Sequence, residues 1–378
     1  MADNNENKVL NVPHLRFPEF TEEWEETTLG KISEITKGSG ISKDQLSEQG
    51  SPCILYGELY TKYKSEIIDE VYSRTELDSS SLVKSKANDV IIPCSGETAI
   101  DISTARCVPF NNILLGGDLN IIRLKHDDGG FFAYQLNGAR KKDIARVAQG
   151  VSVVHLYGEN LKHIRVYHPA IEEQKKITRL LSLIDERIAT QNKIIEKLQS
   201  LIKGLAVALT TKEKANIAIS QCLECHSSTL QESEVLSSGL CKVFGANGLV
   251  GYKDVPQMNG DAILVIKDGS GVGTVSYAQG KFSVIGTLNY LTVIGNNDLR
   301  YLYFALSVFN FQPYKTGMAI PHIYFKDYGK AKIYCPSLAE QKRVANVLDK
   351  LESKLFVEQE LLASFNQQKL YLLGKMFI

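Results

Sequence analysis

Two long stretches of the chain repeat the same pattern of hydrophobic and polar positions. From Ile171 to Leu209, apolar residues recur every three or four positions, which predicts one long helix with a heptad seam. The closing segment 336–378 has the same periodicity, and a shift of 167 positions (Gln191 to Glu358) superimposes the two. The seam positions are Ile177, Leu181, Ile184, Ile188, Gln191, Ile195 and Leu198 in the first helix, and Val344, Leu348, Leu351, Leu355, Glu358 and Leu362 in the second.

The polar pair Gln191 and Glu358 interrupts both seams at the same place. The simplest interpretation is a polar layer that fixes the register of two paired helices. A seam position that faces solvent or a partner subunit remains the alternative.

The segments before the two helices have shorter patterns. Trp24, the only tryptophan, is expected to be a buried anchor, Phe131–Leu136 predicts a helix, and 138–149 predicts a basic helix or loop. Short apolar runs between turn-rich segments predict strands. These runs are Cys53–Tyr56, Ile67–Val71, Val90–Pro93, Ile113–Leu115 and Asn120–Leu124.

Landmarks of the first half recur in the second, shorter half. Each long helix follows a proline and has a Glu-Gln pair in its first turn, within P-A-I-E-E-Q-K-K-I and P-S-L-A-E-Q-K-R-V. The matched positions are Leu29 with Leu230, Gly116–Ile122 with Ile285–Leu291, His155 with His322, and Tyr157 with Tyr324. The predicted domains are 1–168 and 212–335, each followed by a spacer helix at 169–211 and 336–378.

The predicted fold class is α+β, with two domains separated by two long antiparallel helices and related by a pseudo-twofold axis. Each helix alone would expose its apolar seam, so the two are expected to pack on each other. A helix of this length spans ~58 Å at 1.5 Å per residue. A rod of this kind would hold two related domains apart, as paired readers of DNA half-sites require.

Composition limits the charge distribution and the cell compartment of the protein. The 43 basic and 43 acidic side chains cancel, so any basic patch must be local. An odd number of cysteines, a polar start without a secretory leader and the lack of an apolar run long enough to span a membrane predict a cytoplasmic protein with reduced thiols.

The sequence resembles the specificity subunits of type I restriction–modification systems over nearly its whole length. The resemblance rests on the opening V-P-H-L-R-F-P-E-F followed by Trp24, on the paired helix entries, and on the doubled architecture. It implies two target recognition domains that each read half of a split, asymmetric DNA site, with helices that set the spacer. It also implies docking of two adenine methyltransferase subunits and of restriction–translocase subunits. No cofactor is expected in this chain, whereas S-adenosylmethionine, ATP and magnesium are expected in the partners.

Candidate DNA contacts are basic or hydrogen-bonding side chains in loops and on one helix flank. A solvated helix face and ordinary tight turns are the alternatives for them. The candidates are Ser95, Gly96, Arg106, Arg140, Lys141, Lys142 and Arg146 in the first half, and Lys267, Ser270, Lys281, Gln312, Tyr314 and Lys315 in the second.

Three other motifs give weaker functional signals. The loop 267–274 is not a phosphate-binding P-loop, because no G-K-[ST] follows. His155 and His322 are interpreted as a repeated structural pair. Cys222, Cys225 and His226 have the spacing of covalent haem attachment, but a metal site would need further ligands, so chance is the favoured explanation.

Motifs for chemistry are missing from the sequence. It has no N-P-P-[FYW]-type or D-P-P-[FYW]-type tetrapeptide for amino-group methylation, no ATP-binding motif and no convincing carboxylate–lysine nuclease cluster. The chain is therefore expected to recognise without reacting. Two other classes stay open: a coiled-coil scaffold that binds proteins rather than DNA, and a small redox or metal enzyme at Cys222, Cys225 and His226.

Overall fold

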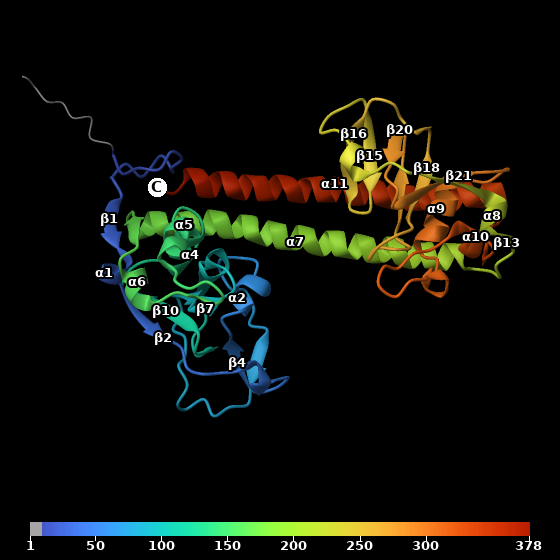
Figure 1. The fold of residues 1–378 in the computed structure, drawn as a ribbon. Coiled ribbons are helices and arrows are strands. Elements are labelled where there is room, and N and C mark those ends of the chain that lie inside the picture. Colours follow the sequence, from blue (N-terminus) through green and yellow to red (C-terminus); the bar gives the residue numbers. More distant parts are fainter. Residues whose placement is uncertain (1–9) are drawn as a thin grey trace, which may run out of the picture. The chain divides into compact units, whose positions relative to one another are not determined.

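The computed structural model describes residues 10–378, which form two compact units (Figure 1). Unit 1 comprises the chain up to Gln191 together with Leu361–Ile378, and unit 2 comprises Asn192–Glu360. Both units are α+β, as the sequence predicts. The sequence boundaries at 168, 211 and 335 remain a prediction of where the recognition domains end.

The two long helices form as the heptad pattern predicts. They are α7 (Ile171–Thr210) and α11 (Leu338–Lys375), and their first residues are separated by the same shift as the seams. Unit 1 contains the start of α7 and the end of α11, whereas unit 2 contains the end of α7 and the start of α11. Each unit thus combines opposite ends of the two helices, which is the predicted antiparallel order.

The seam residues nearest the start of each long helix lie in or beside the core of the unit that contains them. In unit 1, Ile177 and Leu181 share a core with Leu372, and in unit 2, Ala206 shares one with Leu348. The buried seam positions are Ile177, Leu181, Ile184, Gln191, Ile195, Leu198, Val344 and Leu348, and the half-buried ones are Ile188, Leu351, Leu355, Glu358 and Leu362. None of the helices in the described part of the chain is long and apolar enough to cross a membrane.

The globular part of unit 1 is built around two four-stranded sheets, ordered β2-β10-β6-β8 and β3-β5-β4-β9. Its elements are β1 (Glu25–Thr28), α1 (Leu29–Ile32), β2 (Ser33–Lys37), the 3₁₀ helix η1 (Lys43–Gln45), β3 (Leu46–Ser47), β4 (Ser51–Ile54), α2 (Glu58–Thr61), β5 (Ser73–Thr75), β6 (Asp89–Pro93), β7 (Ser95–Gly96), α3 (Ala99–Ile102), β8 (Arg106–Val108), β9 (Leu114–Leu115), β10 (Leu119–Leu124), α4 (Gly129–Asn137), α5 (Lys141–Val147), β11 (Val154–His155), α6 (Gly158–Lys162) and β12 (Arg165–His168).

Unit 2 repeats the first of these sheets. Its first sheet has the order β14-β21-β18-β19, which matches the first sheet of unit 1 strand for strand, and its second has the order β16-β15-β20-β17. Its elements are β13 (Ile217–Ala218), α8 (Ile219–Cys222), β14 (Leu223–Ser227), η2 (Glu232–Glu234), β15 (Cys241–Gly245), β16 (Gly248–Lys253), β17 (Met258–Asn259), β18 (Ala262–Ile266), β19 (Val275–Ala278), β20 (Lys281–Val284), β21 (Leu288–Val293), α9 (Leu299–Ser307), η3 (Gln312–Tyr314), α10 (Phe325–Tyr328) and β22 (Lys332–Ile333).

The glutamine at each helix entry explains why this part of the sequence is repeated. The buried Gln174 accepts a hydrogen bond from the backbone N–H of Asp128, the N-cap of α4, at 2.9 Å, and donates to Pro169 O at 2.9 Å. Gln341 does the same in unit 2, with Asp298 N at 2.8 Å and Pro336 O at 2.9 Å. Each glutamine therefore ties the start of a long helix to the shorter helix beside it.

The core of unit 1 confirms Trp24 as an anchor. It is 2% exposed and packs edge-on against Phe131 of α4, with ring centroids 5.5 Å apart, and against Phe377 near the end of the chain at 6.3 Å. The predicted helix at Phe131–Leu136 is α4, and the basic segment after it contains α5.

Two expectations from the sequence are wrong. The run Ile67–Val71 is not a strand: Ile67 makes one isolated bridge to Cys107, and acidic residues follow at once. The equivalent of Leu29 is Ile219 rather than Leu230. Leu29 begins the short helix before β2, and Ile219 begins the short helix before β14. Their backbone N–H groups donate to matched carbonyls, Ile164 O and Ala331 O. Leu230 lies instead in a separate small cluster with Val243.

Candidate nucleic-acid interface

In unit 1, the predicted loop after β6 meets a hairpin that precedes α6. Ser95 and Gly96 form strand β7, which pairs antiparallel with β11, so that Ser95 lies opposite His155. Hairpin 149–155 is closed by two backbone hydrogen bonds between Gln149 and His155, of 2.9 and 2.7 Å. A Cβ at Gly96 would come within 2.5 Å of Ile102 Cγ2 in α3, so a larger residue here would force Ile102 to move.

Unit 2 has the same arrangement after β18. Hairpin 316–322 is closed by backbone bonds of 2.9 and 2.8 Å between Thr316 and His322, and His322 bridges to Asp268 in the predicted loop 267–274. Gly269 N also donates to Pro321 O at 3.0 Å. Each unit therefore presents a loop and a hairpin that are joined through the backbone.

His155 and His322 lie at equivalent positions in these hairpins. Both backbones close a hairpin, and each imidazole lies near a matched tyrosine: the ring centroids of His155 and Tyr157 are 6.2 Å apart, and those of His322 and Tyr324 are 5.5 Å apart. This geometry supports the interpretation of a repeated structural pair.

Several predicted contacts flank the hairpins. Lys142 and Arg146 are exposed on α5, which leads into hairpin 149–155, and Arg146 is bound to Asp143 at 2.9 Å. Lys141 is half-buried in α5, and burial lowers its pKa, with the Arg106 charge as a second cause. In unit 2, exposed Ser270 lies in the loop.

The remaining predicted residues of unit 2 follow the same pattern around its hairpin. Lys267 is half-buried, and its carbonyl accepts a hydrogen bond from Ile323 N at 2.9 Å. Gln312 is exposed in η3, Tyr314 stacks on Phe309 at 5.9 Å, and Lys315 is half-buried directly before the hairpin.

Two predicted arginines do not lie on this surface. Arg106 is 7% exposed, and its guanidinium donates to the carbonyls of Leu59 at 3.1 Å and Tyr63 at 2.8 Å. Burial lowers its pKa against the pull of nearby acids. Arg140 bonds Asp143 at 3.2 Å and the carbonyl of Ile378. Both arginines hold parts of unit 1 together, so the prediction that they contact DNA does not fit these positions.

Lys281 lies apart from the hairpin of unit 2. It lines a pocket of about 840 Å³ beside α11, together with Arg300. The guanidinium of Arg300 lies 4.3 Å from the ring centroid of Tyr277 and bonds Asp349 and Glu352, each at 2.6 Å. Lys281 is exposed, and among the residues that line this pocket it is the one that the sequence predicts as a DNA contact.

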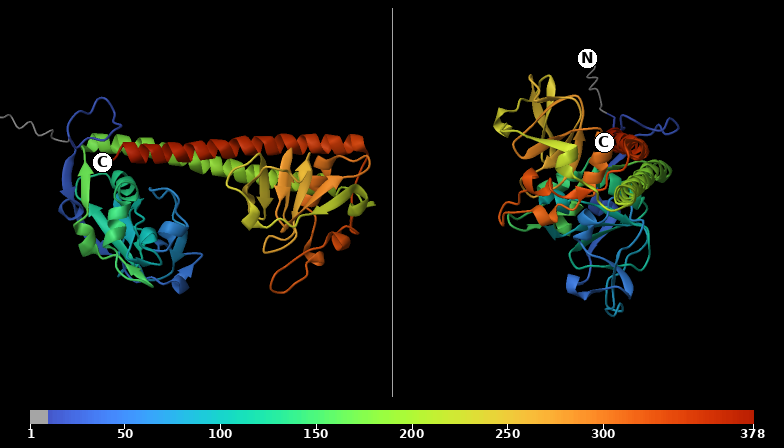
Figure 2. Two further views of the ribbon diagram at one scale, coloured as in Figure 1. Left: turned by 45° about the horizontal axis from the view of Figure 1, so that its top comes forward. Right: turned by 90° about the vertical axis from the view of Figure 1, so that its right-hand side faces the viewer.

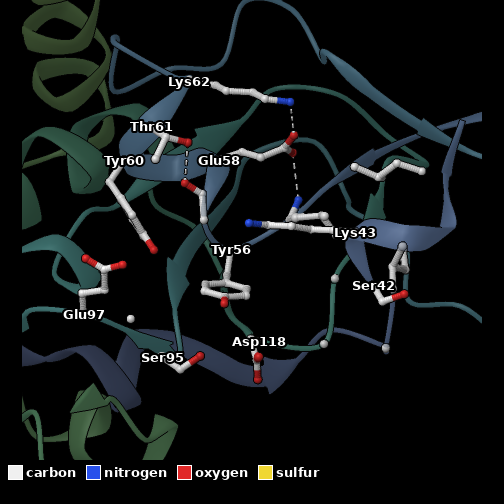
Figure 3. Close-up of a pocket in the computed structure, with 18 of the residues that line it drawn as sticks. Ser42, Lys43, Tyr56, Glu58, Tyr60, Thr61, Lys62, Ser95, Glu97 and Asp118 are labelled. Atoms are coloured by element: carbon white, nitrogen blue, oxygen red, sulfur yellow. Dashed lines mark hydrogen bonds and ion pairs between the residues drawn. The ribbon is translucent and has the colours of Figure 1, made fainter. Parts of the chain in front are cut away.

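Unit 1 contains a cleft of about 1320 Å³ beside its hairpin (Figure 3). Ser95 and Gly96 of the predicted loop line it, and so do Ser152 and Val153 of the hairpin. The lining residues that sequence reasoning missed include Lys43, Tyr56, Tyr60, Glu97 and Asp118. They come from four separate segments, so no local pattern marks them. Only the run Y-G-E-L-Y after a buried strand could have given a signal.

The polar groups of the cleft suit hydrogen bonding to base edges. Glu58 is buried, and its carboxylate accepts from Lys62 Nζ at 2.6 Å, from Leu55 N at 3.0 Å and from the Ser73 hydroxyl, so its charge is compensated. Burial, followed by neighbouring groups that include Glu97, raises the pKa of Tyr60, which keeps its hydroxyl protonated. The carboxylates of the cleft that are exposed are those of Glu97 and Asp118, and carboxylates accept from the amino groups of bases, whereas hydroxyls can donate or accept.

The cysteine–histidine motif lies in a packed sheet. Burial raises the pKa of Cys225 to about 11, so its thiol is protonated at neutral pH. The His226 ring stacks on Tyr290 at 4.8 Å, and its Nε2 lies 2.9 Å from Thr292 Oγ1. No group of three His, Cys, Asp or Glu residues suited to a metal ion occurs among residues 10–378.

Comparison with known proteins identifies the family. Residues 21–200 and 226–367 match the model of the type I restriction modification DNA specificity domain, and this covers most of the chain. The chain belongs to this family. What the match assigns to this chain is the DNA specificity domain of type I restriction–modification systems.

Individual relatives agree with this assignment. The EcoprrI specificity subunit of Escherichia coli is 24% identical over 110 residues (29% of this chain, 27% of that protein), and the MjaVIII specificity subunit of Methanocaldococcus jannaschii is 25% identical over 202 residues (52% and 44%). The matched parts thus span less than half of either relative.

Solved structures share the fold. The type I S subunit from M. genitalium has a TM-score of 0.70 at 19% identity, covering 97% of this chain and 99% of that one. A chain from a structure of a type I R-M complex has a TM-score of 0.55 at 15% identity, covering 94% and 97%.

Proposed function

We propose that the chain is the DNA-recognition subunit of a type I restriction–modification complex and that each unit reads one half of a split, asymmetric site. The observation that carries this proposal is the repeated loop and hairpin. Two units of one fold present the same backbone arrangement, while the side chains on it differ. Two similar but unequal readers suit a site of two unlike halves.

In this proposal, α7 and α11 set the number of unread base pairs between the halves. Two adenine methyltransferase subunits and the restriction–translocase subunits dock on the chain. The partners supply the chemistry, with S-adenosylmethionine, ATP and magnesium as their cofactors, and the complex works in the cytoplasm. Base flipping and methyl transfer belong to the methyltransferase subunits.

The test is to express the chain with its methyltransferase partner and to map methylated adenines across the host genome. We expect a motif of two short blocks with a fixed gap. Methylation at a continuous motif, or no methylation, would contradict the proposal.

A coiled-coil scaffold that binds only proteins is the competing class, and salt dependence separates the two. DNA affinity should fall steeply with salt, and Lys142→Ala should reduce the slope of log K against log salt by about 0.9 if it removes one phosphate contact. Lys193→Ala, an exposed lysine on α7 outside the candidate interface, is the matched control and should leave the slope unchanged. Absence of DNA binding at low salt would favour the scaffold.

A further inference from the structure

The two hairpins carry apolar side chains at their tips, fully exposed to solvent. Val151 is 97% exposed and Met318 is 105% exposed, and the shift that relates the two long helices also relates these two positions. Two residues further along each hairpin the pattern repeats, because Val153 is 53% exposed and Ile320 is 65% exposed. Single exposed apolar residues are common, but the same exposure at two equivalent positions calls for an explanation.

The backbone that holds the tips is repeated as well. Gly150 has φ +118° and Gly317 has φ +88°, and a Cβ at either glycine would lie 2.1 or 2.3 Å from a carbonyl oxygen of the same hairpin. Only glycine fits such a turn. Two backbone hydrogen bonds close each hairpin, and the backbone of the neighbouring loop pairs with it. Both tips are therefore held in place by the backbone.

Cationic side chains flank both hairpins, and acids accompany them: Arg146 is paired with Asp143 at 2.9 Å, and Asp268 bridges to His322. Lys142 and Arg146 precede the first hairpin, and Lys267 and Lys315 lie beside or before the second. In Figure 2, the loop that ends in hairpin 316–322 (orange) projects from unit 2 on the side away from α11. An apolar point with cationic neighbours suits a nucleic acid, whose phosphates pair with the cations and whose base stack accepts the apolar group.

We propose that Val151 and Met318 are wedges that insert between stacked base pairs, one in each half-site. This rests on the proposed function, because it requires that each unit binds DNA. Side chains of this kind unstack a base step and kink the duplex, which opens its groove to the loop beside the hairpin. The chain would then read its site partly through the ease with which one step in each half can be opened.

The experiment uses the full chain with its methyltransferase partner and duplexes that carry the mapped site. 2-Aminopurine, which brightens when unstacked, replaces one base at a time in each half. We expect a bright position in each half in addition to the adenine that is methylated. Val151→Ser should remove the extra signal in one half only, and Met318→Ser should remove it in the other.

Each substitution should also weaken binding roughly tenfold, since burial of one apolar side chain of this size is worth a decade or more in a binding constant. Val255→Ser is the matched control, because Val255 is 76% exposed in unit 2 and lies between β16 and β17, outside the hairpin, and it should change neither signal nor affinity. The unchanged thermal unfolding expected of both tip variants would show that the fold is intact.

Three results would overturn the wedge. Unchanged fluorescence and affinity in both tip variants would show that the tips do not enter the stack. Normal DNA binding with lost methyltransferase recruitment would show that the tips dock a protein instead. In both cases DNA binding persists, so the proposed function survives. If the wild-type complex binds no DNA, the proposed function fails together with the wedge.

Discussion

A paired insertion in the two long helices tests their role as a spacer. Duplicating Asn192–Leu198 in α7 and the matched Gln359–Phe365 in α11 adds one heptad to each helix. The seam positions in these segments repeat in register, so the insertion keeps both apolar faces continuous. The residues that line the candidate interface in either unit are unchanged.

The size of the effect follows from helix and DNA geometry. Seven helical residues add about 10 Å at 1.5 Å per residue. One base pair of B-DNA occupies about 3.4 Å along the duplex. The gap in the methylated motif should therefore grow by at most about three base pairs, with fewer if the helices run oblique to the DNA.

Mapping of methylated adenines in cells that express the variant reads out both the gap and the blocks. Both blocks should keep their sequences while the gap lengthens. The matched control duplicates the heptad in α7 alone, which puts the two helices out of register and should abolish methylation. An unchanged gap in the paired variant would refute the spacer role, and altered blocks would show that the helices read sequence.

Trp24 fluorescence during urea unfolding reports on unit 1 and serves three further predictions. Lys369→Ala should lower the free energy of unfolding by about 3–5 kcal/mol, because it leaves two buried carboxylates without their ammonium partner, and a loss below about 1 kcal/mol would contradict this. Gln174→Ala should cost about 1–3 kcal/mol through unmet hydrogen bonds at the N-cap of α4, whereas a neutral effect would mean that water replaces the amide. The hydrogen bond that His168 donates to the Asp127 carboxylate raises the pKa of His168 against the effect of burial. Wild type should therefore lose its stability advantage over His168→Gln as pH rises above the ordinary histidine pKa of about 6.5 and through the raised one, and a pH-independent difference would exclude the pair as its source.

Periodicity revealed the long helices because a solvent-exposed helix must keep its apolar face at a fixed spacing. The same reasoning explains why the strand predicted at Ile67–Val71 is wrong. Ile68 is buried and Ile67 and Val71 are half-buried, but the backbone makes only one isolated bridge, from Ile67 to Cys107. An apolar run alone cannot tell a strand from an irregular segment. Local patterns record which residues are buried, but not which backbone partner they find.

The candidate interface was predictable in part. Ser95 and Lys267 were found because each follows a buried strand, where a loop must reach the surface. Arg106 was grouped with basic side chains in loops, whereas it lies in strand β8 and its guanidinium meets two carbonyls inside the core. The sequence contains a sign of the hairpin tips, because Val151 and Met318 align between matched glycines and histidines. It does not show that they are exposed, because an apolar residue is ordinarily expected to be buried.

One difference between the units lies in the segment between β4 and β6 and its counterpart in unit 2, and it bears on what each unit can read. The strand pairs β4 with β9 and β15 with β20 are both parallel and hold equivalent places. Between β4 and β6, however, unit 1 carries α2 and the short strand β5 with irregular segments on both sides of it, whereas unit 2 passes from β15 to β18 through β16 and β17. Tyr60 of α2 lines the cleft of unit 1, and unit 2 has no helix at that place in its chain. The repeated strands and hairpins thus supply one way of presenting side chains to DNA. The inserted segment gives unit 1 a cleft of its own, so we expect the two blocks of the site to differ most in the bases that this cleft contacts.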